Sequence, residues 1–239
     1  MTDIKAVLFD CDGTIADSAG LICDIMERCF AAHGLIPPAR EETRAIIGLS
    51  LETAIRALRP ALTANDAARL ADAYREEYRS ERSRAQVPDR LFDGMETLIR
   101  DLAAREAVLV GMVTGKSRRG VAALTASHGM TECFAVVRTA DDCPSKPHPA
   151  MVLESCEELG IRPGNAIVVG DTSYDMEMAR AAGASALGVS WGSHRPDLLR
   201  RSGALQVVET VPDLTVALDR WLGAGGAEPS SQKAAFERD

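Results

Sequence analysis

Two acidic residues stand one residue apart near the start of the chain, at the end of an apolar run. The stretch AVLFDCDGTIADS, residues 6–18, contains this pair, Asp10 and Asp12. Paired carboxylates can act as a nucleophile and a proton carrier, or they can bind a cation through hard oxygen ligands. A lone Asp-x-Asp-Gly is more often a turn or a helix cap, so chemistry is assigned only if other reactive groups join it.

Other groups of this kind follow further apolar runs. Thr114 and Gly115 end one run, Asp171 ends another, and Asp175 follows in the next turn. Lys146 opens a helical pattern between these two runs. Several carboxylates in one cleft repel one another unless a cation is present, and hard oxygen ligands favour Mg²⁺. If the fold brings these residues together, the sequence predicts a Mg²⁺ site with a hydroxyl and a lysine beside it.

Alternating strand and helix patterns are the elements that would bring these residues together. They predict a Rossmann-like α/β core, with a parallel sheet, right-handed crossovers and helices on both faces. Ligands of such sheets bind beyond the carboxyl ends of the strands, which is where the acidic residues stand. The predicted strands cover residues 5–10, 107–115, 134–139, 166–171 and 184–190, and the predicted helices cover 95–105, 117–129, 148–160 and 174–183.

One region breaks the alternation. Residues 16–88 show helical periodicity and no convincing strand, so we expect an all-helical cap inserted after the first strand. The α/β catalytic core is then expected to comprise residues 1–15 and 89–222. Residues 223–239 contain Gly, Pro, Ser and charged residues without apolar periodicity, which predicts a flexible tail.

Composition limits the classes of partner. The chain has 239 residues, of which 46% are hydrophobic, enough for a substantial core. A formal net charge of −8 and the lack of a long basic run argue against a nucleic-acid partner. The first apolar run is too short for a secretory signal or a membrane span, so we expect a cytoplasmic protein without a membrane partner, as a monomer or homodimer. The six cysteines lack metal-site spacing and are expected to be free thiols.

Four motifs resemble those of the haloacid dehalogenase-like hydrolase superfamily, in the same order along the chain. The helical insert is similar to the small helical cap of its phosphoglycolate phosphatase-like branch, and the resemblance covers nearly the whole chain short of the tail. It implies a Mg²⁺-dependent phosphoric monoester hydrolase that acts on a small phosphorylated metabolite, with phosphoglycolate as the best single guess. The motifs are FDCDGT (9–14), VTGK (113–116), KPHP (146–149) and GDTSYD (170–175).

The resemblance implies different roles for the two acids of the first motif. Asp10 would attack phosphorus and form an aspartyl-phosphate, which divides one difficult hydrolysis into two steps. Asp12 would protonate the departing alcohol and then activate water. We expect neighbouring carboxylates to favour the protonated form that the first of these steps needs.

The other motifs imply the metal and phosphate ligands. Mg²⁺ would be held by Asp10, the backbone carbonyl of Asp12 and Asp171, with Asp175 as a further partner. The transferring phosphoryl group would be bound by Thr114, the backbone amide of Gly115 and Lys146. Gly115 departs from the commonest pattern, because many relatives have Asn or Ser there.

The cap should supply the substrate contacts. The segment 46–58 resembles the cap loop and helix of phosphoglycolate phosphatases, with Gly48, Leu49 and Ser50 at the tip and Arg56 as an anion partner. An arginine on a helix is also commonly a solvated surface residue. The basic residues of GKSRRG either create a local positive field for an anion or are surface charges; they are Lys116, Arg118 and Arg119.

Several other classes of protein share part of this pattern. Haloacid dehalogenases lack an acid at the position of Asp12, and phosphonate hydrolases use a cap lysine, whereas residues 16–88 contain none. A sugar phosphomutase or a pyrophosphatase of the same superfamily stays open, although Thr14 favours a hydrolase over a mutase. A receiver-like signalling switch would order these residues differently along the chain. A catalytically dead binding module would not be expected to retain both Asp10 and Lys146.

Overall fold

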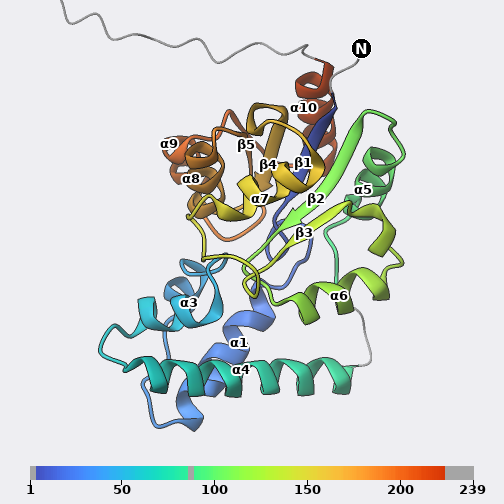
Figure 1. Ribbon diagram of the computed structural model, residues 1–239. Coiled ribbons are helices and arrows are strands. Elements are labelled where there is room, and N and C mark those ends of the chain that lie inside the picture. Colours follow the sequence, from blue (N-terminus) through green and yellow to red (C-terminus); the bar gives the residue numbers. More distant parts are fainter. Residues whose placement is uncertain (1–3, 86–88, 224–239) are drawn as a thin grey trace, which may run out of the picture.

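The computed structural model describes residues 4–85 and 89–223. Within these ranges, one six-stranded parallel sheet has the order β3-β2-β1-β4-β5-β6 (Figure 1). The central strand β1 pairs with β2 on one side and β4 on the other. The expected α/β core is therefore confirmed. The strands are β1 (Lys5–Phe9), β2 (Val108–Val113), β3 (Val136–Arg138), β4 (Ala166–Gly170), β5 (Ser185–Val189) and β6 (Gln206–Val208).

Two helical layers cover the sheet, because its central strand is apolar on both faces. Val7 and Phe9 pack towards α5, α6 and α10, and the alternate residues Ala6 and Leu8 pack towards α7, α8 and α9. All four side chains are fully buried, which makes the end of β1 rigid. The helices are α5 (Met95–Ala103), α6 (Arg118–Ser127), α7 (Ala150–Leu159), α8 (Ser173–Ala182), α9 (Pro196–Ser202) and α10 (Val211–Gly223).

Besides the hydrophobic clusters on the two faces of the sheet, a third hydrophobic cluster lies within the region between β1 and α5. It joins α1 (Ala19–Ala32), the loop after α2 (Arg40–Arg44), α3 (Leu51–Leu58) and α4 (Ala64–Ala85). Figure 1 shows α1, α3 and α4 beyond the carboxyl ends of the strands. Hydrogen bonds between the segments that leave and re-enter the core hold this helical unit in place; they join Asp17 to Arg90 at 2.8 Å and Phe92 to Ile15 at 3.0 Å.

The end of the core contains elements that the sequence patterns did not predict, namely α9, β6 and α10. Strand β6 has three residues, and in the described part of the chain its one partner is β5, so its sequence has too few alternating positions to be recognised. The predicted tail lies outside the described residues from 224 onward, and Gly223 is the last residue of α10. The expected cap limit at residue 88 also lies outside them. No helix of the described part has the length and apolar character needed to cross a membrane.

Candidate active site

Asp10 is held at the end of β1 by both its backbone and its side chain. Its N–H donates to the carbonyl of Val169 on β4, at 2.9 Å. Lys146 Nζ donates to Asp10 Oδ1 at 2.6 Å and to Asp175 Oδ1 at 2.6 Å, and all three side chains are buried. Burial lowers the pKa of Lys146, but Asp10 and Asp175 raise it by more. The pKa therefore lies above its usual range, and the ammonium stays charged. Lys146 therefore links the first and fourth motifs.

Asp171 lies at the end of β4 with both carboxylate oxygens bound. Thr14 Oγ1 donates to Oδ1 at 2.9 Å, and the Ser193 N–H donates to Oδ2 at 2.7 Å. Gly13 has a φ of 90°, and a Cβ there would lie 2.3 Å from Asp171 Oδ2. The turn after Asp10 therefore requires glycine, both for its backbone conformation and for its contact with Asp171.

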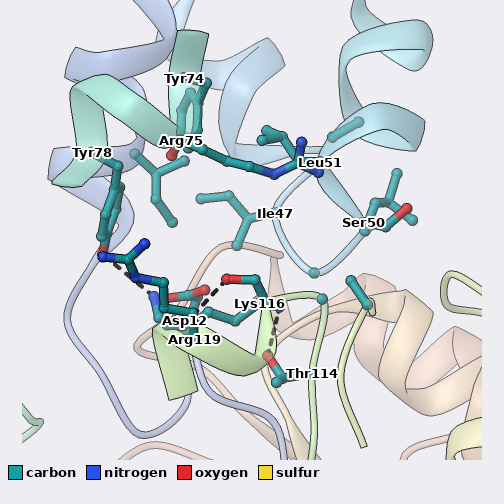
Figure 2. A pocket seen from close by; sticks show the side chains of 18 of the residues that line it. Asp12, Ile47, Ser50, Leu51, Tyr74, Arg75, Tyr78, Thr114, Lys116 and Arg119 are labelled. Carbon is teal, nitrogen blue, oxygen red and sulfur yellow. Dashed lines mark hydrogen bonds and ion pairs between the residues drawn. The ribbon is translucent and has the colours of Figure 1, made fainter. Parts of the chain in front are cut away.

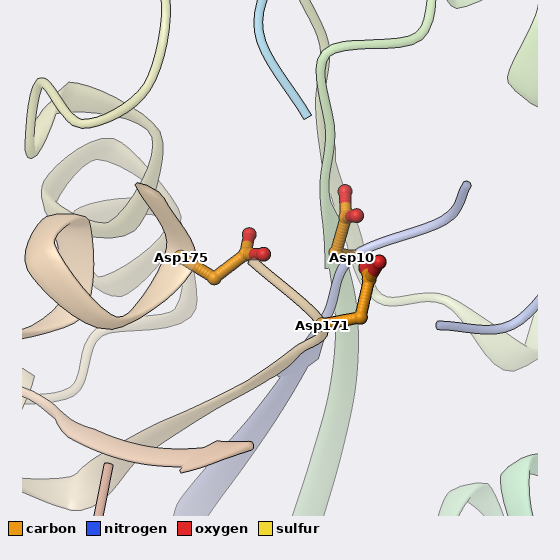
Figure 3. Close-up of side chains that lie close together, drawn as sticks. All are labelled: Asp10, Asp171 and Asp175. Atoms are coloured by element: carbon orange, nitrogen blue, oxygen red, sulfur yellow. The ribbon is translucent and has the colours of Figure 1, made fainter. Parts of the chain in front are cut away.

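The three buried carboxylates form a cluster with metal-ligand spacing. One ligand oxygen from each of Asp10, Asp171 and Asp175 lies within 4.8 Å of the other two (Figure 3). Burial raises the pKa of Asp10 to about 8, with Lys146 opposing and the other two acids adding to the shift. Burial, together with Asp175, raises the pKa of Asp171 to about 6. A cation at this position would offset both the burial and the mutual repulsion that raise these two pKa values.

One oxygen of the cluster lacks a partner. Asp10 Oδ2 is buried, and no described residue donates a hydrogen bond to it. A buried carboxylate oxygen without a donor is costly, and a hard cation or the phosphorus of a substrate would satisfy it. Asp175 differs, because Oδ1 binds Lys146 and Oδ2 accepts from the Thr172 hydroxyl at 2.7 Å. Both oxygens of Asp175 are therefore engaged, one with Lys146 and one at the start of α8, and neither is available to a metal ion.

Asp12 has other neighbours than the expected carboxylates. Lys116 Nζ and Ser18 Oγ each lie 2.8 Å from Asp12 Oδ1, and the aspartate is absent from the three-acid cluster. Tyr78 of α4 stacks beside this pair, with Lys116 Nζ 5.0 Å from its ring centroid. The expectation that neighbouring carboxylates favour a protonated Asp12 finds no support in these contacts, because the side-chain partners of Asp12 are a lysine and a serine.

The end of β2 lies directly against the helical unit. Thr114 is buried, and its Oγ1 accepts a hydrogen bond from the Lys116 N–H at 3.2 Å. A Cβ on Gly115 would lie 2.6 Å from the carbonyl oxygens of Gly48 and Leu49. Gly115 is therefore needed for the close approach of the 48–49 backbone, which explains why no larger residue stands there.

Further contacts tie the same loop to the core. The Ser50 N–H donates to Ser145 Oγ at 2.9 Å. The carbonyl oxygen of Ala45 accepts from Tyr174 Oη at 2.9 Å and lies 3.2 Å from His194 Nε2. Because His194 Nδ1 accepts from a backbone N–H, Nε2 is the nitrogen that carries the proton. The predicted tip residues thus lie over the carboxyl edge of the sheet.

A cavity of about 680 Å³ separates the helical unit from the sheet edge (Figure 2). Asp10, Asp12 and Thr114 line it on the side of the core, and apolar residues line it on the side of the helices, among them Ile47, Leu51 and Tyr74. The predicted tip residues Gly48, Leu49 and Ser50 also line it. Arg56 does not, because it lies on the exposed face of α3. The expectation of an anion contact at Arg56 finds no support in this arrangement.

Three residues that contact the site were not predicted from the sequence. Ser193 follows β5, so it stands at a strand end where ligands of parallel sheets gather, and that position was an available signal. Tyr78 belongs to an apolar helical stripe, whose pattern predicts only burial. Ser18 precedes α1 and resembles a helix cap in sequence. The last two carry no local signal of their contacts with Lys116 and Asp12.

The parallel sheet with buried acids, a lysine and a cavity at its carboxyl edge defines an α/β enzyme. Residues 7–189 match the family model described as haloacid dehalogenase-like hydrolase. The chain belongs to this family.

Named relatives span nearly the whole chain. A phosphoglycolate phosphatase from Photorhabdus laumondii is 29% identical and covers 88% of this chain and 91% of its own length. An N-acetylmuramic acid 6-phosphate phosphatase from Pseudomonas aeruginosa is 31% identical, with coverages of 92% and 96%. The crystal structure of a hydrolase from Pseudomonas syringae superposes with a TM-score of 0.80 at 26% identity, and covers 91% of this chain and 98% of that chain.

Proposed function

We propose that this protein is a Mg²⁺-dependent phosphatase that hydrolyses small organic phosphate monoesters, with phosphoglycolate as the first candidate substrate. The observation that carries the proposal is the state of Asp10. This carboxylate lies on the cavity wall, is fixed through Oδ1 by Lys146, and has a buried Oδ2 to which no described residue donates. An oxygen held in this way is positioned for attack on phosphorus.

Side chains around Asp10 would bind the group that is transferred. Phosphoryl transfer depends on charge stabilisation and positioning more than on covalent chemistry by the protein. Lys146 supplies a buried positive charge at the nucleophile, and Thr114 supplies a hydroxyl on the cavity wall. The backbone N–H of Gly115 is the further donor that we assign to the phosphoryl oxygens.

The acid cluster fits a divalent cation. Asp10, Asp171 and the backbone carbonyl of Asp12 would hold Mg²⁺, and Asp175 would support them through Lys146. When bound, the ion supplies charge neutralisation for the acids and the phosphate. The raised pKa values of Asp10 and Asp171 and the spacing of the three acids support this assignment.

We assign proton transfer to Asp12. It lines the cavity on the side where the helical unit closes over the core, so it faces the position of a leaving group. Its hydrogen bonds to Lys116 and Ser18 hold one oxygen, and the second is available to the substrate. In this proposal residues 16–88 act as a cap that excludes water and selects the leaving group.

A second candidate substrate class is favoured by the size of the cavity. A volume of about 680 Å³ lies within the range of about 300–1,000 Å³ that is usual for pockets of larger organic ligands. Glycolate would fill a small part of it. Sugar phosphates, on which the Pseudomonas aeruginosa relative acts by name, are therefore the second class to test.

Phosphate release tests the proposal. The folded protein is incubated with phosphoglycolate, sugar phosphates, pyrophosphate and p-nitrophenyl phosphate, with and without Mg²⁺. We expect Mg²⁺-dependent release from at least one monoester. Conversion of a sugar phosphate to its isomer without release would assign a mutase instead, and no turnover of any compound would overturn the proposed function.

A further inference from the structure

Cationic side chains line the cavity on the side of α4, but they already have acidic partners. Arg75 lies 2.8 Å from Asp72, and Arg82 lies 2.7 Å from Asp89. A guanidinium that is paired with a carboxylate has less charge available for a ligand. The arginines of α4 are therefore poor candidates for binding an anionic substrate.

Two other cations, Lys116 and Arg119, lie near the start of α6 and are better placed to bind an anion. Arg119 lines the cavity, and within the described ranges it makes no ion pair or side-chain hydrogen bond. Figure 2 shows its side chain on the wall of the cavity where Tyr78 lies. Lys116 lies one turn earlier and is only 8% exposed, with Asp12 as its acidic partner. Lys116 is therefore paired with an acid, whereas Arg119 has no acidic partner among the described residues.

Lys116 keeps its charge in this position. Burial lowers the pKa of Lys116, but Asp12 and Tyr78 raise it, so that it lies well above the usual range. The ammonium is therefore a fixed cation beside the residue to which we assign proton transfer.

Asp12 also fixes the distance between this cation and the substrate. A general acid must lie about 2.6–3.2 Å from the oxygen that it protonates. Lys116 Nζ lies 2.8 Å from the same carboxylate. The ester oxygen would contact the other carboxylate oxygen of Asp12, so the ammonium lies within two hydrogen-bond lengths and the width of the carboxylate, about 8 Å in all, of the ester oxygen. A carboxylate attached to the carbon that bears the ester oxygen extends from that oxygen towards the ammonium.

We propose that Lys116 and Arg119 form a carboxylate subsite on the leaving-group side, which selects phosphate monoesters of 2-hydroxy acids. The inference rests on the proposed phosphatase function and names the residues that choose its substrate. Lys116 shares its hydrogen bonds between Asp12 and the carboxylate of the substrate, and Arg119 supplies a second positive charge that no described acid pairs with. The apolar wall beyond them accommodates carbon substituents on the acid.

Kinetics with a matched pair of substrates test the subsite. Phosphoglycolate carries the carboxylate, and phosphoglycolamide replaces it with a neutral group of the same shape. Because a hydrogen bond to a charged group contributes about 1.5–3 kcal/mol, we expect the wild-type protein to prefer phosphoglycolate by about 10- to 100-fold in kcat/KM. Arg119→Met should reduce this preference several-fold by raising KM for phosphoglycolate, with KM for phosphoglycolamide unchanged.

Variants at Lys116 separate charge recognition from the support of Asp12. Lys116→Met should bring the ratio of the two kcat/KM values close to one, in addition to any common loss of kcat. Lys116→Arg should retain part of the preference, since it retains the charge. The control is Arg118→Met, because Arg118 is exposed, pairs with Asp142 and does not line the cavity. Its ratio should match that of the wild-type protein.

The outcomes distinguish this inference from the proposed function. Hydrolysis of both compounds with similar kcat/KM by the wild-type protein, or an unchanged preference in Arg119→Met and Lys116→Met, would overturn the carboxylate subsite alone. If neither these esters nor p-nitrophenyl phosphate is hydrolysed in the presence of Mg²⁺, the proposed phosphatase function is overturned, and the subsite with it.

Discussion

Asp10 and Asp12 have different surroundings because the strand ends just before them and the chain then turns. In a continuing strand, side chains two residues apart would face the same side. Here β1 ends at Phe9, and a turn closed by hydrogen bonds from the Ile15 and Ala16 N–H groups to the carbonyl of Cys11, each at 2.9 Å, redirects the chain. Asp10 therefore faces the acid cluster, and Asp12 faces the cavity. This separation allows one residue to attack and the other to transfer protons.

The role of Asp12 predicts a dependence on the leaving group. Asp12→Asn should lower kcat for alkyl phosphates by about 10²- to 10⁴-fold, the usual contribution of a general acid. The loss should be much smaller for p-nitrophenyl phosphate, because its leaving group departs without a proton. Steady-state rates for the two ester types measure the difference. Equal losses would contradict the assignment.

The control for this variant is Asp17→Asn. Asp17 is exposed and belongs to the same connecting segment, so its replacement should leave both rates unchanged. A comparable loss in Asp17→Asn would mean that the effect arises from the connection and not from proton transfer.

At the scale of elements, the site depends on how closely the 48–50 loop approaches the end of β2. This contact is formed by the backbone, since a Cβ on Gly115 would overlap two carbonyl oxygens. The Ala45 carbonyl, bound by Tyr174 and His194, and the Ser50 N–H, bound by Ser145, fix the same loop on its other side. The cavity therefore keeps its shape through several weak contacts distributed along one loop.

Replacing Gly115 tests the importance of this contact. Gly115→Ala should push the 48–50 loop away from β2, destabilise the protein by about 1–3 kcal/mol, as overpacking commonly does, and lower kcat/KM. Chemical denaturation and steady-state kinetics measure the two effects. Unchanged stability and activity would contradict this prediction, because they would show that the 48–50 loop can move away without loss of free energy or of the site geometry.

The matched control is Gly164→Ala. Gly164 lies in a short turn before β4, with no atom within 4 Å of an added Cβ. Its variant should differ little from the wild-type protein in either measurement. A similar loss in both variants would mean that the effect of Gly115→Ala is not specific to the loop contact.

Hydrophobic patterns along the sequence correctly predicted the long buried strands of the core. Buried strands such as β1 and β4 are continuous apolar runs, so their ends and the acids that follow could be located. Strand β6 was missed because its three residues are stabilised by pairing with β5. Helices α9 and α10, which pack on opposite faces of the sheet, were missed with it, since no expected strand lay between them.

Contacts between distant segments were beyond the sequence patterns. Tyr78 and Lys116 are 38 residues apart and meet only because α4 lies over α6. The same holds for Asp12 and Lys116, which are 104 residues apart. A lysine after a strand end indicates a basic group near the site, but its partner depends on tertiary packing. For that reason the neighbour of Asp12 could not be predicted, whereas the position of Asp10 could.

For the whole molecule, the buried acids couple folding to pH and to metal binding. The pKa values of Asp10 and Asp171, about 8 and about 6, lie above the ordinary value of 3.8, so the folded state retains protons that the unfolded chain releases. The stabilisation from these protons is complete below about pH 3.8. It is lost as the pH rises through about 6 and about 8. A divalent cation replaces the protons and reverses the trend.

This coupling predicts that Mg²⁺ stabilises the protein more at higher pH. Without metal, Tm should fall between pH 6 and pH 9. Mg²⁺ at about 100 times its Kd at pH 8 should add about 2.7 kcal/mol at that pH, and the same concentration should raise Tm less at pH 6. Thermal unfolding with and without the metal measures both effects. No increase, or an increase that is larger at pH 6, would contradict a carboxylate metal site.

Asp171→Asn provides the control for this measurement. The variant removes one carboxylate charge from the cluster; its amide oxygen can still accept from the Ser193 N–H, and its NH2 group can donate to the Thr14 hydroxyl oxygen. The stabilisation by Mg²⁺ should be largely lost. Its full retention would place the metal elsewhere.

The most direct measurement of the central claim is the covalent state of Asp10 during turnover. The protein is mixed with Mg²⁺ and a phosphate ester, quenched in acid within the first turnovers, and digested for mass spectrometry. We predict one added phosphoryl group on the peptide that contains Asp10, and neither the adduct nor steady-state activity in Asp10→Asn, whose Tm shows that it is folded. Turnover without an adduct on Asp10, or substantial activity in Asp10→Asn, would contradict the account.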